Sequence, residues 1–199
     1  MRDETPPLRA VSELPWLVAK RVFGEAPDGP WINAPALRFL KGIIRPQWRV
    51  FEFGSGRSTI WYAKHVASVV ALESAARWHA QVEQDLARYD NAAVELLSAR
   101  EFPSRMRNEL DSTFDLVVVD GPDADECGCV LPPELDRTGC ICASVTKVRP
   151  GGVLVLDNSD LPRYRQADST LAGWRCVRIS GFTTSPLTPM ETSFYWRPR

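Results

Sequence analysis

The chain has 199 residues, of which 44% are hydrophobic and 25% are charged, and its formal net charge is -1. This length fits one domain with a real hydrophobic core, and the charge balance excludes a strongly basic protein that binds nucleic acid or an anionic membrane. No stretch approaches the ~20 apolar residues that a membrane helix needs, so we expect neither a nucleic-acid nor a membrane partner.

The first 48 residues predict a leader and helices that pack on the rest of the chain. The acidic, proline-bearing start lacks the apolar core of a signal peptide. Five cysteines without an export signal favour reduced thiols, so we expect a cytoplasmic protein. Apolar residues at helical spacing predict helices near 14–23 and 36–44. A turn-rich break at 24–30 separates them, and Pro46 ends the second.

From residue 49 onward, short apolar strands alternate with helical segments. Strands are predicted at 49–53, 66–72, 93–97, 114–119, 153–156, 175–180 and 192–197, and helices at 59–65, 78–89, 135–148 and 163–172. Such alternation predicts βαβ units, an α/β fold and a mostly parallel sheet covered on both faces. We therefore expect residues 49–199 to form the core of what is one domain overall, with ligands bound beyond the carboxyl ends of the strands.

The loop after the first strand carries the strongest signal in the sequence. Glu52 ends the strand, and Gly54 and Gly56 allow a sharp turn and close approach of a ligand. A carboxylate at this position suits a positively charged ligand and would repel a pyrophosphate. Glu73 ends the second strand about 20 residues later, where its two oxygens can accept hydrogen bonds from ribose hydroxyls. Thr59 stands where a dinucleotide-binding loop has its third glycine, which argues against a nicotinamide cofactor.

These residues resemble the first motif of the class I methyltransferases, which bind S-adenosylmethionine. Phe114–Pro122 resembles the fourth strand of that family, and Pro150–Leu154 its fifth strand. One departure is Ser58, at the third glycine of the family pattern. The resemblance covers roughly residues 30–199. Further likeness to small bacterial methyltransferases of mostly unassigned substrate lies in Asp157–Asp160, Arg163–Arg165, Ser180–Phe182 and Thr192–Phe194.

The resemblance implies a Rossmann-like, doubly wound sheet of seven strands whose last strand is antiparallel, with an N-terminal helical extension. It also implies a set of cofactor-binding residues: Glu52, Gly54, Ser55, Gly56, Ser58, Thr59, Glu73, Ser74, Ser98 and Asp120. The cofactor expected from this set is S-adenosylmethionine.

Three polar residues after the fourth and fifth strands are the candidates for catalysis. Asp120, Asp157 and Asn158 resemble the magnesium ligands of metal-dependent O-methyltransferases, and hard oxygen ligands suit such an ion. A divalent site is therefore one interpretation. The other is that these residues cap helices or contact cofactor and substrate directly. The catalytic lysine of those enzymes has no counterpart, since Asp123 and Asp125 stand in that region.

Four cysteines and one tryptophan can each be interpreted as functional or as purely structural side chains. Cys127 and Cys129, with Cys140 and Cys142, offer four thiols, but their spacing differs from a zinc knuckle and the second pair falls in a predicted helix, where it would point apart. Trp78 is placed either to stack near an adenine or to act as a partly buried anchor.

Three functions remain open at this level. The leading one is methyl transfer to oxygen or nitrogen of a small molecule, because no large insertion is present to grip a protein or a duplex. The alternatives are a nicotinamide-dependent oxidoreductase and a non-catalytic binding or scaffold domain. A homo-oligomer is compatible with the sequence.

Overall fold

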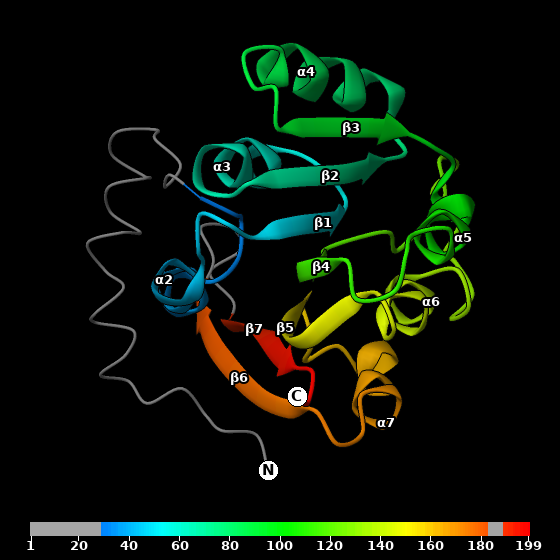
Figure 1. Cartoon of the computed structure of the whole chain (residues 1–199). Helices are drawn as coiled ribbons and strands as arrows, with labels where there is room; N and C mark the ends of the chain where they lie inside the picture. The colour runs from blue at the N-terminus through cyan, green and yellow to red at the C-terminus, as the bar shows by residue number, and fades with distance from the viewer. Residues whose placement is uncertain (1–28, 183–188) are drawn as a thin grey trace.

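The structure is a computed structural model that describes residues 29–182 and 189–199. The described residues form a seven-stranded sheet in the order β3-β2-β1-β4-β5-β7-β6 (Figure 1). The strands are β1 (Arg49–Phe53), β2 (Ser68–Glu73), β3 (Ala92–Leu96), β4 (Phe114–Val119), β5 (Val148–Asp157), β6 (Arg175–Phe182) and β7 (Pro189–Trp196). Strands β1 to β5 pair in parallel, and β7 is antiparallel to β5 and β6. The expected doubly wound sheet with an antiparallel last strand is confirmed.

Helices cover both faces of this sheet (Figure 1). One face carries α2 (Ala34–Ile43), α3 (Arg57–His65) and α4 (Ala76–Leu86). The other carries α5 (Phe102–Arg107), α6 (Arg137–Ser144) and α7 (Ala167–Thr170), with short 3-10 turns η1 (Ala99–Glu101) and η2 (Pro162–Tyr164). Because helices cover both faces of the sheet, the central strands carry mostly apolar side chains on both faces and do not alternate between apolar and polar residues.

The two faces bury two separate clusters of side chains. In β1, Val50 packs towards α2 and α3, whereas Phe51 and Phe53 pack towards α5 and α6. In β4, Val118 and Val119 divide between the same two clusters. Alternation along a strand sets this division. Glu52, between Phe51 and Phe53, is a buried carboxylate at the end of the central strand.

Some predicted boundaries are wrong. The helix expected at 135–148 is shorter because β5 already begins at Val148. The helix expected at 163–172 is two short pieces, η2 and α7, which end before Gly173 in the left-handed region. Helix α5 was not predicted, since its six residues, including Pro103, are too few to show a helical period. The helix expected near 14–23 lies outside the described residues.

Helix α2 is fixed to the far edge of the sheet by its capping residue. Asn33 is fully buried, and its side-chain oxygen accepts a hydrogen bond from the Ala36 N–H at 2.9 Å. Its amide group donates to the Ile179 carbonyl at 2.9 Å and to the Thr192 hydroxyl at 3.1 Å. One side chain therefore caps a helix and joins it to β6 and β7.

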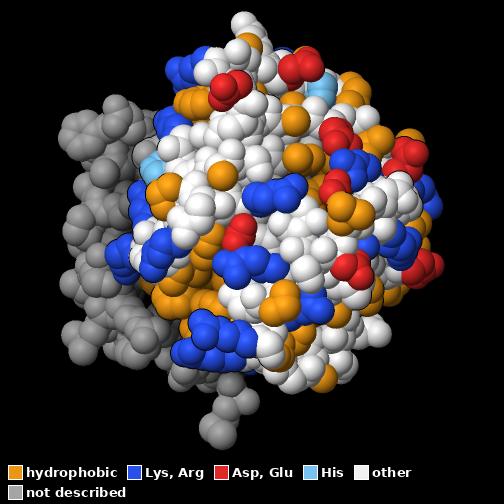
Figure 2. Space-filling model, viewed as in Figure 1, with side chains coloured by type: hydrophobic (Ala, Val, Ile, Leu, Met, Phe, Trp, Pro, Cys, Tyr) orange, Lys and Arg blue, Asp and Glu red, His pale blue; other side chains and the backbone are white. Residues whose placement is uncertain are grey.

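None of the helices in the described part of the chain is long and apolar enough to cross a membrane. On the face in Figure 2, basic and acidic side chains both occur, with apolar ones between them.

Candidate functional site

The glycine loop between β1 and α3 packs directly on the loop after β4. Gly54 has φ +94°, in the left-handed region that favours glycine, and a Cβ atom there would lie 3.7 Å from the main-chain carbonyl of Asp120. The Asp120 N–H donates to the Phe53 carbonyl at 3.1 Å. The loops after β1 and β4 therefore meet where the strand order reverses, which is the usual ligand position in such sheets.

Glu52 is a buried acid beneath this loop, with only 1% of its surface exposed. The Thr59 hydroxyl donates to its carboxylate at 2.6 Å and accepts from the Gly56 N–H at 3.0 Å. Burial raises the pKa of Glu52 to about 7, against hydrogen bonds from Ser58 and Thr59 that lower it. A buried carboxylate with such a pKa favours a cation nearby, because a cation would stabilise its charged form.

Glu73 fixes the opposite wall of the loop. Its Oε1 accepts hydrogen bonds from the N–H groups of Ser74 and Ala75, each at 2.9 Å, and its Oε2 accepts one from the Ser55 hydroxyl at 2.7 Å. A carboxylate oxygen has two lone pairs, so Oε2 keeps room for one further donor. Ser98 lies beyond β3 and caps η1.

Trp78 from α4 holds the glycine loop. Its indole N–H donates to the Ser55 carbonyl at 2.9 Å, and its ring lies 3.4 Å from where a Cβ of Gly56 would be. Because 48% of Trp78 is exposed, this anchor is only partly buried.

The ends of β4 and β5 bring Asp120 and Asp157 towards Glu52. Burial raises the pKa of Asp120, and the charges of Asp157 and Glu52 raise it further, while Arg137 lowers it. Burial also raises the pKa of Asp157. Tyr62 from α3 is buried, and burial, with the charges of Glu52, Asp120 and Asp157, raises its pKa. These acids therefore crowd one small region at the carboxyl edge of the sheet.

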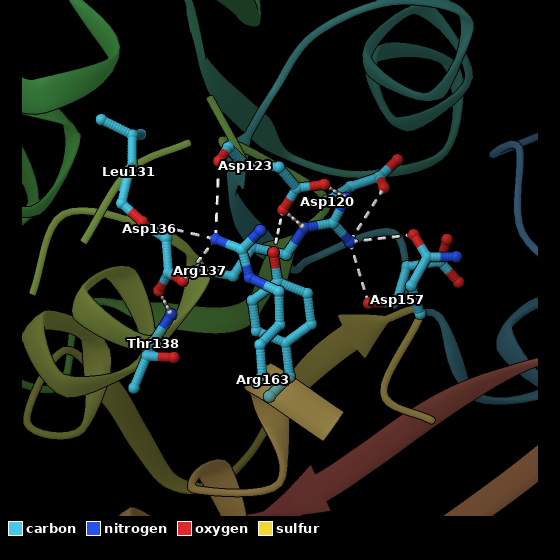
Figure 3. A network of polar contacts seen from close by, with 10 residues as sticks. Asp120, Asp123, Leu131, Asp136, Arg137, Thr138, Asp157 and Arg163 are labelled. Carbon is cyan, nitrogen blue, oxygen red and sulfur yellow. Dashed lines mark hydrogen bonds and ion pairs between the residues drawn. The ribbon is translucent and has the colours of Figure 1, made fainter. Parts of the chain in front are cut away.

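Arg137, the first residue of α6, lies among the oxygens at this edge (Figure 3). Its Nη1 donates to the Asp157 carbonyl at 2.8 Å and to the Asn158 side-chain oxygen at 3.1 Å, and lies 3.5 Å from the Asp120 carboxylate. Its Nε and Nη2 bind the two oxygens of Asp123 at 2.9 and 3.1 Å. A fixed guanidinium thus binds the Asn158 oxygen and approaches the Asp120 carboxylate, two of the oxygens that a divalent ion would need, so these residues do not fit such an ion.

The remaining part of this network ties down the segment after β4. Asp136 caps α6 through the Thr138 N–H at 2.6 Å and accepts from Arg163 at 2.9 Å. The Tyr164 hydroxyl donates to Asp123. These bonds join the segment between β4 and α6 to η2 (Figure 3).

Comparison with solved structures identifies this architecture. The chain resembles an O-methyltransferase from Bacillus cereus solved with SAH, with a TM-score of 0.63 at 15% identity over 98% of this chain and 93% of that one. It resembles the N-methyltransferase NodS from Bradyrhizobium japonicum WM9, with a TM-score of 0.57 at 16% identity over 80% and 90% of the two chains. The chain has the class I methyltransferase fold.

The same fold occurs in an rRNA methylase from Streptococcus thermophilus, with a TM-score of 0.57 at 12% identity over 84% of this chain and 99% of that one. No family model matches the chain, and no curated protein matches its sequence. The likeness therefore rests on the fold alone.

The cysteines are free thiols. Cys140 is buried and Cys142 is exposed, as expected for positions i and i+2 of a helix, and Cys127 and Cys129 are exposed. In residues 29–182 and 189–199, no group of three or more His, Cys, Asp or Glu side chains is arranged to hold a metal ion.

Sequence reasoning missed Arg137 and Tyr62. A helix was expected to include position 137, and Asp136 before it is a typical cap, but nothing local indicates that the next side chain turns towards β4 and β5. Tyr62 follows Glu52 by ten residues and shows only as an apolar position of α3. Only the packed fold reveals these contacts.

Proposed function

We propose that this protein transfers a methyl group from S-adenosylmethionine to an oxygen or nitrogen atom of a small molecule. The observation that supports this most is the buried Glu52 beneath the Gly54–Gly56 loop, with Glu73 across from it, at the reversal point of a methyltransferase fold. A negative floor and a glycine-lined approach suit a cationic nucleoside better than a pyrophosphate.

Each proposed cofactor residue has a defined part. Glu73 offers its remaining acceptor to a ribose hydroxyl, and Ser55 and Ser74 hold that carboxylate in place. Glu52 supplies negative charge, and Ser58 and Thr59 orient it. Gly54 and Gly56 leave room above the loop, Asp120 borders it, and Ser98 marks the end of β3 on the same edge.

The bound cofactor supplies a methyl group on a positively charged sulfur, which leaves as a neutral thioether when the new bond forms. The protein must then align the acceptor, exclude water and take one proton from it. Asp120 is the proposed base: in its ionised form, the raised pKa makes it a stronger proton acceptor than an ordinary carboxylate. Asp157 and Asn158 border the same space, where the Asp157 carboxylate accepts from the Thr192 hydroxyl at 2.6 Å.

The overall charge favours a small acceptor over an RNA. The net charge is -1, which does not favour the phosphate backbone of an RNA. The segment between β4 and α6, held by Arg163 and Tyr164, borders the site and is the proposed determinant of acceptor choice.

The test is a panel of small phenols, carboxylates and amines incubated with S-adenosylmethionine, with release of S-adenosylhomocysteine measured. We expect turnover on at least one class and a loss of 100-fold or more in kcat in Asp120→Asn. The matched control is Asp111→Asn, whose exposed side chain pairs with Lys147 far from the carboxyl edge, and it should retain activity.

Other outcomes identify the alternatives. Binding of S-adenosylhomocysteine without turnover on the whole panel would favour a non-catalytic binding or scaffold domain. Tight binding of NADH in a fluorescence titration, without binding of S-adenosylhomocysteine, would contradict the proposal and support an oxidoreductase.

A further inference from the structure

Arg137 is a buried cation built into the carboxyl edge of the sheet. Only 5% of its surface is exposed, and such a charge is stable only when it is paired and hydrogen-bonded. Asp123 binds it with both oxygens, and the guanidinium carbon lies 5.4 Å from the centre of the Tyr164 ring. Tyr164 also donates to Asp123, so the anion and the ring that hold the guanidinium are themselves joined.

The oxygens that end β4 and β5 are directed at this guanidinium. Asn158 and the Asp157 carbonyl accept from Nη1, and the Asp120 carboxylate lies 3.5 Å from it. The Asp157 carboxylate is instead bound by Thr192. A divalent ion needs several of these oxygens at about 2.0–2.6 Å, and it would then lie against a fixed positive charge.

We infer that the guanidinium of Arg137 is the resident cation of this edge, in the place that a divalent metal ion would need. Arg137 is a positioning residue: it holds Asp120, Asp123 and Asn158 in their orientations beside the cofactor loop without a metal. The role of Arg137 in orienting Asp120 for catalysis rests on the proposed methyl transfer. The exclusion of a metal ion by its guanidinium does not.

The experiment is a titration with Mn²⁺, followed by loss of the free-ion EPR signal, on the ligand-free protein and two variants. We expect no stoichiometric Mn²⁺ site in the wild-type protein up to about 1 mM, a concentration that corresponds to about -4 kcal/mol. Arg137→Ala frees Asp120, Asp123 and Asn158. We expect this variant to gain one Mn²⁺ site per chain, with a Kd at least tenfold below the limit of about 1 mM set for the wild type. Arg137→Lys keeps a cation and should exclude Mn²⁺ as the wild type does.

The matched control is Arg149→Ala. Arg149 pairs with Asp115 at the opposite end of β4, so its loss removes an ion pair but frees a single carboxylate, and no Mn²⁺ site should appear. A Mn²⁺ site in the wild-type protein that Asp157→Asn abolishes would overturn the inference. So would a folded Arg137→Ala variant, checked by circular dichroism, that gains no site.

If Arg137→Ala does not fold, the wild type and Arg137→Lys decide the matter by the same titration.

Calorimetry with S-adenosylhomocysteine in EDTA and in MgCl₂ separates the inference about Arg137 from the proposed methyl transfer. Equal affinity in both supports the inference, and binding that needs Mg²⁺ overturns it. Failure to bind in either, with the Mn²⁺ results as expected, would contradict methyl transfer and leave the assignment of Arg137 intact.

Discussion

Glu52 shows how one buried carboxylate makes the molecule sensitive to pH. Its pKa of about 7 in the folded protein is above the ordinary 4.5, so between these values the folded chain holds a proton that the unfolded chain releases. The stability from this proton is complete below pH 4.5 and is lost as the pH rises through 7. The total is roughly 3 kcal/mol.

We therefore predict that the free energy of unfolding of the wild type, relative to Glu52→Gln, falls by roughly 3 kcal/mol between pH 4.5 and 8. Urea unfolding of both proteins across this range measures it. A relative stability that does not change with pH would contradict this prediction. Saturating S-adenosylmethionine should flatten the dependence, because its positive charge stabilises the ionised carboxylate.

At this scale the sequence predicts residues whose roles follow from their place in the chain. Glu52, Gly54 and Glu73 could be singled out because a strand end, a tight turn and the next strand end occur at typical intervals. Arg137 and Asp123 could not, because their contacts with each other and with Asn158 join segments 14 to 21 residues apart. Nothing in the local pattern specifies such pairs.

Among the elements, α2 depends most on a single side chain. Asn33 accepts one hydrogen bond from α2 and donates to Ile179, Met190 and Thr192 on β6 and β7. Thr192 in turn binds Asp157, so the cap is linked to the end of β5.

We predict that Asn33→Ala lowers the free energy of unfolding by roughly 2–4 kcal/mol, because it removes a helix cap and leaves buried polar groups unpaired. Urea unfolding at neutral pH measures the change. Asn108→Ala is the control: this exposed residue follows α5 and should alter stability by less than about 0.5 kcal/mol. A loss below about 1 kcal/mol in Asn33→Ala would show that α2 is held by its apolar face alone.

The elements differ in how well the sequence predicts them. The central strands β1 and β4 were predicted at their observed bounds because they are apolar runs stopped by polar or glycine residues. Helices α5 and α7 have six and four residues, too few for a period, and packing on the sheet stabilises them instead.

For the whole molecule, the order of the strands determines where chemistry can occur. The reversal between β1 and β4 places the glycine loop beside Asp120, and the neighbouring β5 adds Asp157 and Asn158. This arrangement was predictable, since alternating strands and helices with right-handed crossovers leave few topologies. The position of α6, which brings Arg137 to the same edge, was not, because its packing depends on contacts across the fold.

The central claim is that the carboxyl edge binds the nucleoside of S-adenosylmethionine through Glu73 and the glycine loop above Glu52. The most direct measurement is calorimetry of ligand-free protein with S-adenosylhomocysteine, repeated on Glu73→Ala and on Glu83→Ala, which changes an exposed acid of α4. We predict micromolar binding, about -8 kcal/mol, weakened at least tenfold in Glu73→Ala and unchanged in Glu83→Ala. No heat of binding at several temperatures, or equal affinity in Glu73→Ala, would contradict the account.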